Sequence, residues 1–378
     1  MAIDYNSLPS PCFVMDEERL RKNLDSIRTI GQEAGVKFIL AFKSFAMWSM
    51  FPVIREYIET AAASSLSEAR LCFEEMGNLA HTYSPVFKEG EFGEIAEMSS
   101  HITFNSLDQY QRFGNQLKKF PNVSPGLRIN PEHSEIDHDL YNPCSPGSRF
   151  GIRAEDLSGG LPGGIEGLHF HVLFEADSYT FEKTLRVVEK KFGHLLDGLK
   201  WINMGGGHLV TGRDYNAGHL VDILKDFRRR HNLEIILEPG SAFAWETGEL
   251  VSTVEDIVTN QGITTAILDV SFTAHMPDCL EMPYKPAVYG ALDPVDGLPT
   301  YRLGGNSCLS GDFMGDWSFQ MPLKKGDRII FKDMMHYTMV KTTTFNGVPH
   351  PDIVVWNTDG TFRIIRSFGY DNYKNRLS

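Results

Sequence analysis

Short apolar runs and stretches of helical periodicity alternate along the first two thirds of the chain. Such runs are typical of strands buried on both faces of a parallel sheet, whereas apolar residues at every third or fourth position indicate amphipathic helices. We predict strands at Lys37–Lys43, Thr60–Ser65, Ala80–Ser84, His101–Asn105, Gly126–Asn130, Gly167–Val172, Leu199–Met204 and Glu234–Glu238. Helices are predicted between them, at Ser67–Met76, Leu107–Phe120, Ser178–Leu196 and Tyr215–His231.

This alternation predicts an α/β fold, a (β/α)8 barrel of the TIM type, because parallel strands joined by crossover helices close into a barrel. An open, doubly wound sheet is the structural alternative. The segment Pro131–Arg153 has little periodicity and is expected to form an irregular excursion after the fifth strand. We assign residues 14–242 to this barrel domain.

The pattern changes after Pro239-Gly240, where strands and turns follow one another with hardly any convincing helix. Dipeptides such as Asn346-Gly347 mark the turns. The chain is therefore expected to end in an all-β domain, a barrel or sandwich, over residues 243–378, to which residues 1–13 contribute a strand. Its strands are predicted at Ser10–Asp16, Glu249–Val258, Thr264–Val270, Ala287–Tyr289, Asp327–Phe331, Ile353–Asn357 and Phe362–Ser367.

Composition narrows the class of protein. Hydrophobic residues make up 42% of the chain and charged residues 22%, the balance of an ordinary soluble globular protein. No apolar stretch approaches the ~18–20 residues of a membrane span, and the N-terminus lacks the pattern of a secretory signal. The five cysteines form no CxxC pair, so we expect reduced thiols in a cytoplasmic protein and no metal site.

The net charge of −13 at pH 7 argues against nucleic acid as a partner and favours a cationic partner or substrate. Solubility alone also accounts for an acidic surface, so charge does not choose between these readings.

The first predicted strand ends in an unusual residue, Lys43. A buried ammonium group is costly unless it is paired or neutralised. Desolvation lowers the pKa of a lysine and frees its amine as a nucleophile, which is what an imine-forming lysine requires. The alternative is a strand-end lysine whose ammonium group reaches solvent.

Other reactive residues occupy the C-terminal ends of predicted strands, where barrels build their active sites. His169 and His171 end the sixth strand, Gly205–Gly207 the seventh and Glu238 the eighth. An imine-forming lysine, a flat ring, phosphate-binding glycines and a carboxylate are the parts that pyridoxal phosphate requires. Alternate residues of a strand point to opposite faces, so we assign the ring to His171 and expect His169 to pack in the core.

The segments around these residues resemble one family. The matching stretches include AFKSF around Lys43, HFHVLFEAD at 169–177, MGGGH at 204–208, EPGSAFAWETG at 238–248, GGNSCLSGDFMGDWSF at 304–319 and HYTMVKTTTFNG at 336–347. They are similar to the carboxynorspermidine (carboxyspermidine) decarboxylases, pyridoxal-phosphate enzymes of the alanine-racemase-like type, fold type III. Sister families usually carry Gly-Ser-Gly or Gly-Ser-Gln where Leu173-Phe174-Glu175 stands here, and an acidic residue in place of Leu309.

The resemblance implies decarboxylation of carboxynorspermidine or carboxyspermidine, in polyamine biosynthesis, by a homodimer with shared active sites. It implies that Lys43 holds pyridoxal phosphate as a Schiff base, that Glu238 pairs with the ring nitrogen, and that Cys308 protonates the α-carbon in a neighbouring subunit's site. The remaining cofactor contacts that it implies are His171, Gly206, Gly207, Gly240, Ser241 and Tyr337, with Arg128 and Arg149 in support.

The distal amines of such a substrate are cations, so its far end needs acidic partners. Asp312, four residues after Cys308, is the first choice, although a role as a buried brace of its loop is the alternative. The candidates are Asp312, Asp316, Glu175, Asp278 and Glu281.

Other activities remain as alternatives. One is a decarboxylase of another amino acid, such as diaminopimelate, and another is a racemase or a non-enzymatic pyridoxal-phosphate carrier. Racemases of this fold have arginine where Glu238 stands, and carriers are single barrels without a β domain, so both are less favoured than a decarboxylase.

Overall fold

The chain forms two compact units in a computed structural model that describes residues 2–136 and 139–378. One unit is Asn23–Phe243, and the other combines the residues up to Lys22 with Ala244–Ser378. Two positions of the predicted excursion Pro131–Arg153, residues 137 and 138, lie outside the described residues.

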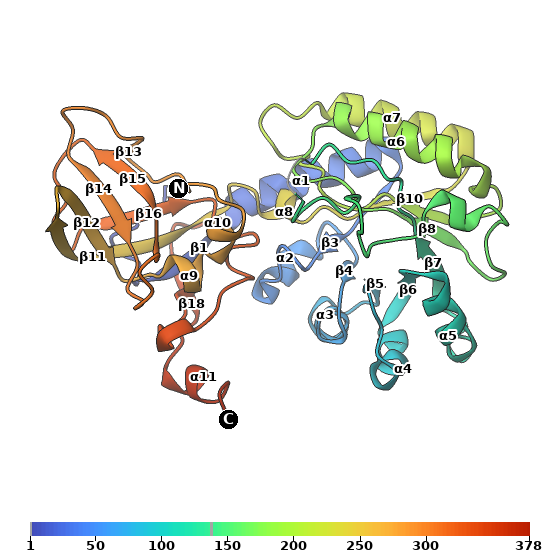
Figure 1. Cartoon of the computed structure of the whole chain (residues 1–378), viewed down its shortest axis with the longest axis horizontal. Coiled ribbons are helices and arrows are strands. Elements are labelled where there is room, and N and C mark those ends of the chain that lie inside the picture. The colour runs from blue at the N-terminus through green and yellow to red at the C-terminus, as the bar shows by residue number, and fades with distance from the viewer. Residues whose placement is uncertain (1, 137–138) are drawn as a thin grey trace. The chain divides into compact units, whose positions relative to one another are not determined.

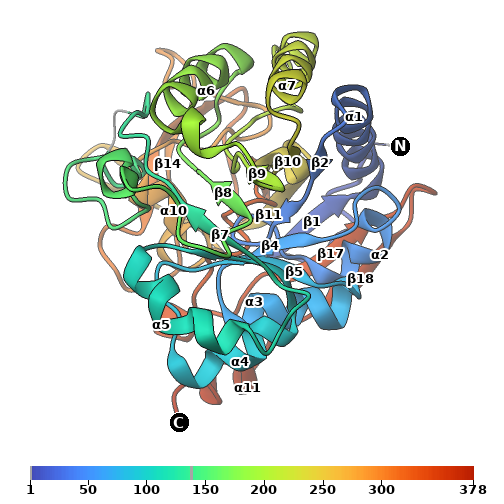
Figure 2. The ribbon, with the colours of Figure 1, turned by 90° about the vertical axis from the view of Figure 1, so that its right-hand side faces the viewer.

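Parallel strands form a barrel in the first unit (Figure 2). The segments β2 and β3 are two pieces of one stretch of chain, so the pairing of β2 with β10 and of β3 with β4 closes the sheet. The predicted barrel is therefore confirmed. Its strands follow the order β2 (Lys37–Phe38), β10 (Glu234–Leu237), β9 (Trp201–Asn203), β8 (Gly167–His169), β7 (Ser124–Arg128), β6 (Ser99–Phe104), β5 (Ala80–Tyr83), β4 (Ala61–Ala63) and β3 (Leu40–Ala41).

The first strand ends earlier than the apolar run predicts. The backbone N–H of Ser44 donates to the Ala41 carbonyl over 3.2 Å, which turns the chain at residues 42–44. Lys43 therefore lies in a turn after the strand, where its side chain is free of the strict alternation of a strand.

Helices surround the barrel strands (Figure 2). Several begin at a polar N-cap whose side chain accepts a hydrogen bond from a first-turn N–H, as Ser65, Ser106, Asp177 and Asn216 do. The helices are α1 (Glu17–Ala34), α2 (Phe51–Ile54), α3 (Leu66–Leu71), α4 (Glu89–Glu97), α5 (Leu107–Leu117), α6 (Ser178–Phe192), α7 (Ala217–His231) and α8 (Ser241–Ala244), with short turns η1 (Trp48–Met50), η2 (Cys72–Met76), η3 (Ala154–Leu157) and η4 (Gly193–Leu195).

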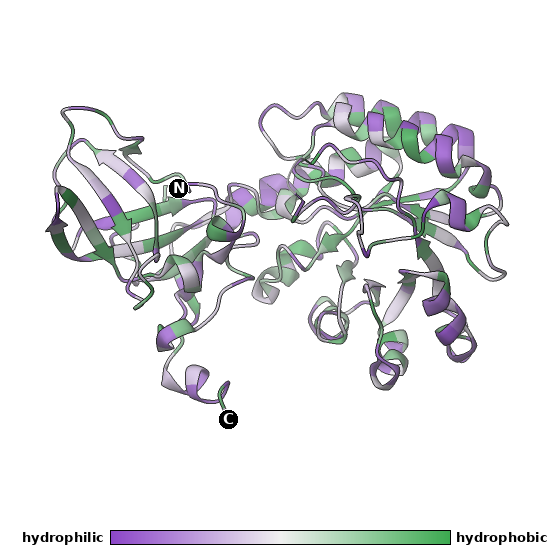
Figure 3. Ribbon diagram, in the orientation of Figure 1, coloured by the Kyte–Doolittle hydropathy of each residue, from purple (hydrophilic) through white to green (hydrophobic). Residues whose placement is uncertain are grey.

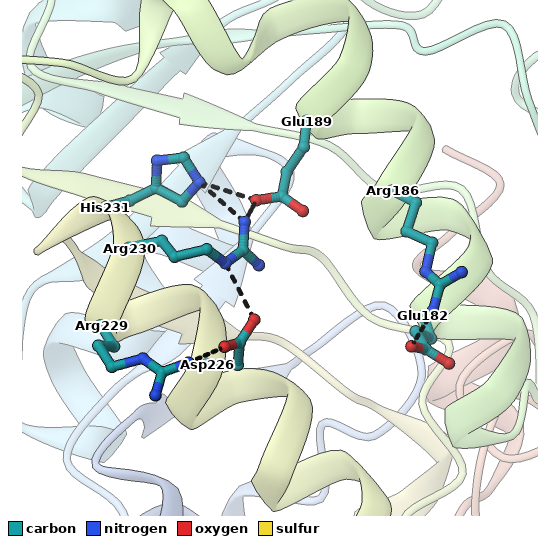
Figure 4. A network of polar contacts seen from close by, with 7 residues as sticks. All are labelled: Glu182, Arg186, Glu189, Asp226, Arg229, Arg230 and His231. Carbon is teal, nitrogen blue, oxygen red and sulfur yellow. Dashed lines mark hydrogen bonds and ion pairs between the residues drawn. The ribbon is translucent and has the colours of Figure 1, made fainter.

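The helices α6 and α7 are amphipathic (Figure 3), with residues such as Phe181 and Leu224 buried. Their charged side chains meet at the surface (Figure 4). His231 on α7 lies 2.8 Å from the Glu189 carboxylate on α6, and Arg230 pairs with the same carboxylate. The half-buried pair of Glu189 and His231 joins α6 to α7.

The indole of Trp201 packs against two neighbouring strands of the barrel. A Cβ added to Gly126 on β7 would lie 2.2 Å from the indole, and one added to Gly167 on β8 would lie 2.1 Å from it. Ile39 and Ile236 complete this small apolar cluster. These two glycines are therefore required by close packing.

The second unit is built on a sheet of nine strands. β1 lies between β11 and β17, so the N-terminal strand is part of this sheet, and Cys12, Val14, Val251 and Val354 lie in its core. The strands, most of them labelled in Figure 1, run in the order β13 (Ala291–Leu292), β15 (Phe313–Phe319), β14 (Thr300–Gly304), β12 (Ile263–Leu268), β11 (Gly248–Asn260), β1 (Cys12–Asp16), β17 (Asp352–Trp356) and β18 (Phe362–Arg366), with β16 (Arg328–Lys332) also paired to β11.

Local details of this unit differ from the sequence-based prediction. The predicted strand Ala287–Tyr289 is wrong, because Val288 makes only an isolated bridge to Phe331. Strands β13, β14 and β15 were not predicted, and short helices interrupt the expected all-β pattern. These are α9 (Phe272–His275), α10 (Pro277–Glu281), α11 (Tyr370–Lys374) and the turn η5 (Phe345–Gly347). Among the described residues, no helix is long and apolar enough to cross a membrane.

Candidate active site

Lys43 lies at the C-terminal end of the barrel strands, in the turn after β3. Its Nζ is 2.8 Å from Nε2 of His171, and the side chain remains accessible to solvent. The surrounding protein nevertheless desolvates the amine strongly enough to lower the pKa of Lys43 to about 8, against the opposing effect of the Glu238 charge. A solvent-accessible amine with a lowered pKa is suited to act as a nucleophile.

The tautomer of His171 follows from its second contact. The backbone N–H of Gly206 donates to Nδ1 over 2.8 Å, so Nδ1 carries no proton. Burial, and then the charge of Lys43, lower the pKa of His171 well below its usual value, which keeps the ring neutral. Its one proton is therefore on Nε2 and faces Lys43, an arrangement that favours the neutral amine.

Glu238 follows β10 and is held through both carboxylate oxygens. Oε1 lies 3.2 Å from Nε2 of His169, and Oε2 accepts a hydrogen bond of 3.0 Å from Nδ2 of Asn203. Burial raises the pKa of Glu238, but His169, Asn203 and the Lys43 charge outweigh it and lower the pKa below its usual value. The carboxylate is thus kept ionised in a desolvated site.

His169 packs in the barrel core as expected, at 1% exposure, but it also contacts a residue of the site. The side chain of His169 reaches Glu238, and His171 Nδ1 also lies 3.8 Å from Oε1 of Glu238. Strand β8 ends at His169, so the alternation between strand faces does not extend to His171. Neither His169 nor Asn203 was assigned to the site from sequence, although Asn203 stands just before the glycine run.

The glycine run leaves no room for side chains. A Cβ on Gly206 would lie 2.3 Å from the Glu238 carbonyl oxygen, and one on Gly207, at φ +85°, would lie 2.1 Å from the Leu173 carbonyl oxygen. A Cβ on Gly240 would lie 1.5 Å from Ser44 Oγ. The amide of Gly206 is directed at His171 in this structure.

Four further candidates lie in the same unit. Arg128 is 5% exposed and donates to the His171 carbonyl over 3.0 Å, which supports the chain beside the site. Ser241 is half-buried and begins α8, directly after Gly240. Arg149 and Glu175 are exposed to solvent.

The donor set fits pyridoxal phosphate. The barrel brings together a nucleophilic amine at Lys43, a neutral imidazole at His171, an ionised carboxylate at Glu238 and a turn of side-chain-free backbone at Gly206–Gly207. An amine, a flat ring, a carboxylate and an approachable backbone are the groups this cofactor needs.

The other predicted cofactor and catalytic residues belong to the second unit. Cys308 is exposed, and its backbone N–H donates to Oδ1 of Asn346 over 2.9 Å. Tyr337 is half-buried and has φ +41°. Both therefore sit in loops of this unit.

The acidic candidates of the second unit differ sharply in their partners. Both carboxylate oxygens of Asp312, which is 4% exposed, accept backbone N–H groups, from Thr273 over 3.0 Å and from Ser307 over 3.1 Å. Asp312 therefore braces its loop. Glu281 pairs with Lys341, and Asp316 bonds Arg302 over 3.0 Å.

Asp278 is buried on α10 and leaves one oxygen unused. Its Oδ2 accepts hydrogen bonds of 2.8 Å from both Tyr284 Oη and Thr338 Oγ1. Its Oδ1 is buried without a hydrogen-bond partner among the described residues. A buried carboxylate oxygen in this state is energetically suited to a cation.

Comparison with known proteins identifies the family of the chain. Residues 12–335 match the family model described as pyridoxal-dependent decarboxylase, C-terminal sheet domain. The chain is 52% identical to the carboxyaminopropylagmatine decarboxylase of Synechocystis sp., over 98% of this chain and 96% of that protein. It is 41% identical to the carboxynorspermidine/carboxyspermidine decarboxylase of Campylobacter jejuni, over 98% of this chain and 99% of that protein.

A solved structure supports the same relationship. The carboxynorspermidine decarboxylase of Campylobacter jejuni complexed with norspermidine has a TM-score of 0.91 and 40% identity to this chain, covering 98% of this chain and 100% of that one. The resemblance seen in the sequence is thereby confirmed, as are the decarboxylase class and the cofactor, pyridoxal phosphate. The chain belongs to the pyridoxal-dependent decarboxylases with a C-terminal sheet domain.

Proposed function

We propose that the protein removes carbon dioxide from a carboxylated polyamine, carboxynorspermidine or carboxyspermidine, and releases norspermidine or spermidine. The observation that carries the proposal is 41% identity over nearly the whole length of a relative with that name. Carboxyaminopropylagmatine is a second candidate substrate, because the relative named for it is 52% identical. All three substrates pair a carboxylate to be removed with a distant cationic end.

The residues of the barrel have distinct roles in this reaction. Bound pyridoxal phosphate supplies the electron sink that receives the electron pair left by the departing carboxylate. Lys43 would hold the cofactor through its side-chain amine, which the low pKa of this lysine favours. Glu238 holds a proton at the ring nitrogen, a task that its ionised state supports. His171 would lie against the ring, and the phosphate would be bound by Gly206, Gly207, Gly240, Ser241 and Tyr337.

Cys308 donates a proton to the α-carbon in place of the departed carboxylate, and we assign it to the site of the neighbouring protomer in a homodimer. Its exposure supports this assignment, because a thiol that serves another subunit must be accessible at the surface of its own.

All five cysteines are free, which supports a reducing, cytoplasmic compartment.

Asp278 is the acidic residue that we assign to the distal cation of the substrate. Asp312, Asp316 and Glu281 already use their carboxylates on protein groups, whereas Asp278 keeps a buried oxygen without a partner in the described structure. Asp278→Asn should raise the KM for the carboxylated polyamine about tenfold or more and leave cofactor affinity unchanged. Asp316→Asn is the control, and equal KM values for the two variants would remove Asp278 from the substrate site.

A substrate panel tests the function itself. The holoenzyme is given carboxynorspermidine, carboxyspermidine, carboxyaminopropylagmatine and meso-diaminopimelate, and carbon dioxide release is followed. We expect the specificity constant for one of the carboxylated polyamines to exceed that for diaminopimelate by about 10²-fold or more. A preference for diaminopimelate would overturn the proposal.

A further inference from the structure

Two buried side chains hold the Glu238 carboxylate, and neither belongs to the set expected from the sequence. We propose that His169 and Asn203 are positioning residues that keep Glu238 ionised and aimed at the ring nitrogen of pyridoxal phosphate. The inference rests on the proposed role of Glu238. It assigns to His169 and Asn203 a role in the chemistry, although neither needs to touch the cofactor.

Asn203 links Glu238 to the glycine run. Its Oδ1 accepts the backbone N–H of Gly205 over 2.8 Å, and this contact fixes which end of the amide faces Glu238. The NH₂ group is thereby turned to Oε2 of Glu238, at 3.0 Å. Asn203 is 4% exposed, so water does not compete for this hydrogen bond.

His169 supplies the second donor. Its Nε2 lies 3.2 Å from Oε1 of Glu238, and an ionised carboxylate only accepts hydrogen bonds, so Nε2 carries the proton. Burial lowers the pKa of His169, which keeps the ring neutral. The ring packs beside Tyr83, with ring centroids 5.4 Å apart, and this contact limits its rotation.

The charge on Glu238 depends on these donors. The titratable groups that act on its carboxylate are His169, His171, Lys43 and, through its ring hydroxyl, Tyr83. Burial alone raises the pKa of Glu238, and the hydrogen bonds oppose it. Without the His169 donor, the effect of burial on the pKa of Glu238 is less well balanced. The pKa then rises, and the carboxyl group takes up a proton at higher pH. A protonated Glu238 no longer stabilises a proton on the ring nitrogen.

The test compares His169→Phe, which keeps a flat ring beside Tyr83 but has no donor, with His169→Gln, which restores an N–H donor. The titration of Glu238 is followed by carbon-13 NMR in the cofactor-free protein, with Glu238→Gln to assign the signal. In His169→Phe we expect the Glu238 carboxyl to bind protons about tenfold more tightly than in the wild type. In His169→Gln the proton affinity of the Glu238 carboxyl should stay within about threefold of the wild-type value.

The kinetics of the enzyme loaded with pyridoxal phosphate provide a second test. For His169→Phe we expect kcat to fall by about tenfold or more with KM changed less than about threefold, and His169→Gln should recover most of the loss. Asn203→Ala should act in the same direction and provides an independent variant if His169→Phe does not fold. The inference is overturned if the Glu238 titration is unchanged in folded His169→Phe and Asn203→Ala, or if His169→Gln behaves like His169→Phe. The NMR titration needs no substrate, so its outcome is independent of which polyamine the enzyme accepts.

Discussion

Lys43 and Glu238 are two ionisable residues at one end of the barrel, and the protein lowers the pKa of each with a different chemical consequence. Desolvation lowers the pKa of Lys43 to about 8, which makes the neutral amine accessible near neutral pH. Glu238 is also desolvated, yet hydrogen-bond donors and the nearby lysine keep its pKa low. A reactive amine and a stable negative charge are thereby available in the same site.

The lowered pKa of Lys43 predicts how cofactor loading depends on pH. Only the neutral form of the Lys43 amine can attack the aldehyde of pyridoxal phosphate, and this form predominates above the pKa of Lys43. Loading of the cofactor-free protein should therefore rise about tenfold per pH unit below pH 8 and level off above it. At pH 7 roughly one lysine in ten is neutral, against fewer than about one in a thousand at the ordinary pKa. Stopped-flow absorbance measures the rate.

Glu238→Gln provides the matched control for this pH profile. The Glu238 charge raises the pKa of Lys43, so its removal should shift the midpoint of loading to lower pH. A loading rate that keeps rising tenfold per unit to pH 10 in the wild type would contradict the lowered pKa.

Some residues of the site can be predicted from sequence because strand ends identify them. Lys43, His171 and Glu238 each follow an apolar run, and the structure brings all three together. His169 and Asn203 could not be predicted in the same way. Their contact with Glu238 depends on where β8 stops and on how the Asn203 amide is turned, and neither is visible in the hydrophobic pattern.

At the scale of elements, barrel strands such as β9 (Trp201–Asn203) and β10 (Glu234–Leu237) were predictable because they are largely buried on both faces, which gives short apolar runs. The strands of the second unit are harder to recognise. In β15 (Phe313–Phe319), Gly315 and Asp316 break the apolar run, and Gly315 has φ +76°. The short helices α9 and α10 are held by side-chain contacts such as that of Asp278 with Thr338, which lies far away in the sequence.

The packing of β7 and β8 on Trp201 gives a prediction for stability. Gly126→Ala places a methyl group 2.2 Å from the indole, which must then move. We expect the folded state to lose about 1–3 kcal/mol of stability, measured by denaturant unfolding. Gly159→Ala is the control, because a Cβ there has no neighbour within 4 Å. Equal stabilities of the two variants would show that Trp201 is not tightly packed.

At the scale of the whole molecule, the proposed active site draws on two protomers. Lys43 belongs to the barrel unit and Cys308 to the second unit. Two inactive variants, Lys43→Ala and Cys308→Ala, should therefore complement each other when they are mixed and allowed to exchange subunits.

The expected recovery follows from counting sites. Half of the dimers are mixed, and each mixed dimer has one complete site, so carbon dioxide release should return to about a quarter of the wild-type value. Each variant mixed with itself is the control. Absence of recovery under conditions where mass spectrometry shows mixed dimers would contradict a site shared between subunits.

The bond between Lys43 and the cofactor tests the central claim most directly. The holoenzyme is reduced with borohydride and digested, and the modified lysine is located by peptide mass spectrometry. We predict a single reduced adduct on Lys43, and a Lys43→Ala protein that folds and dimerises but has neither adduct nor measurable carbon dioxide release. An adduct on another lysine, or one that persists in Lys43→Ala, would show that the active site has been placed wrongly.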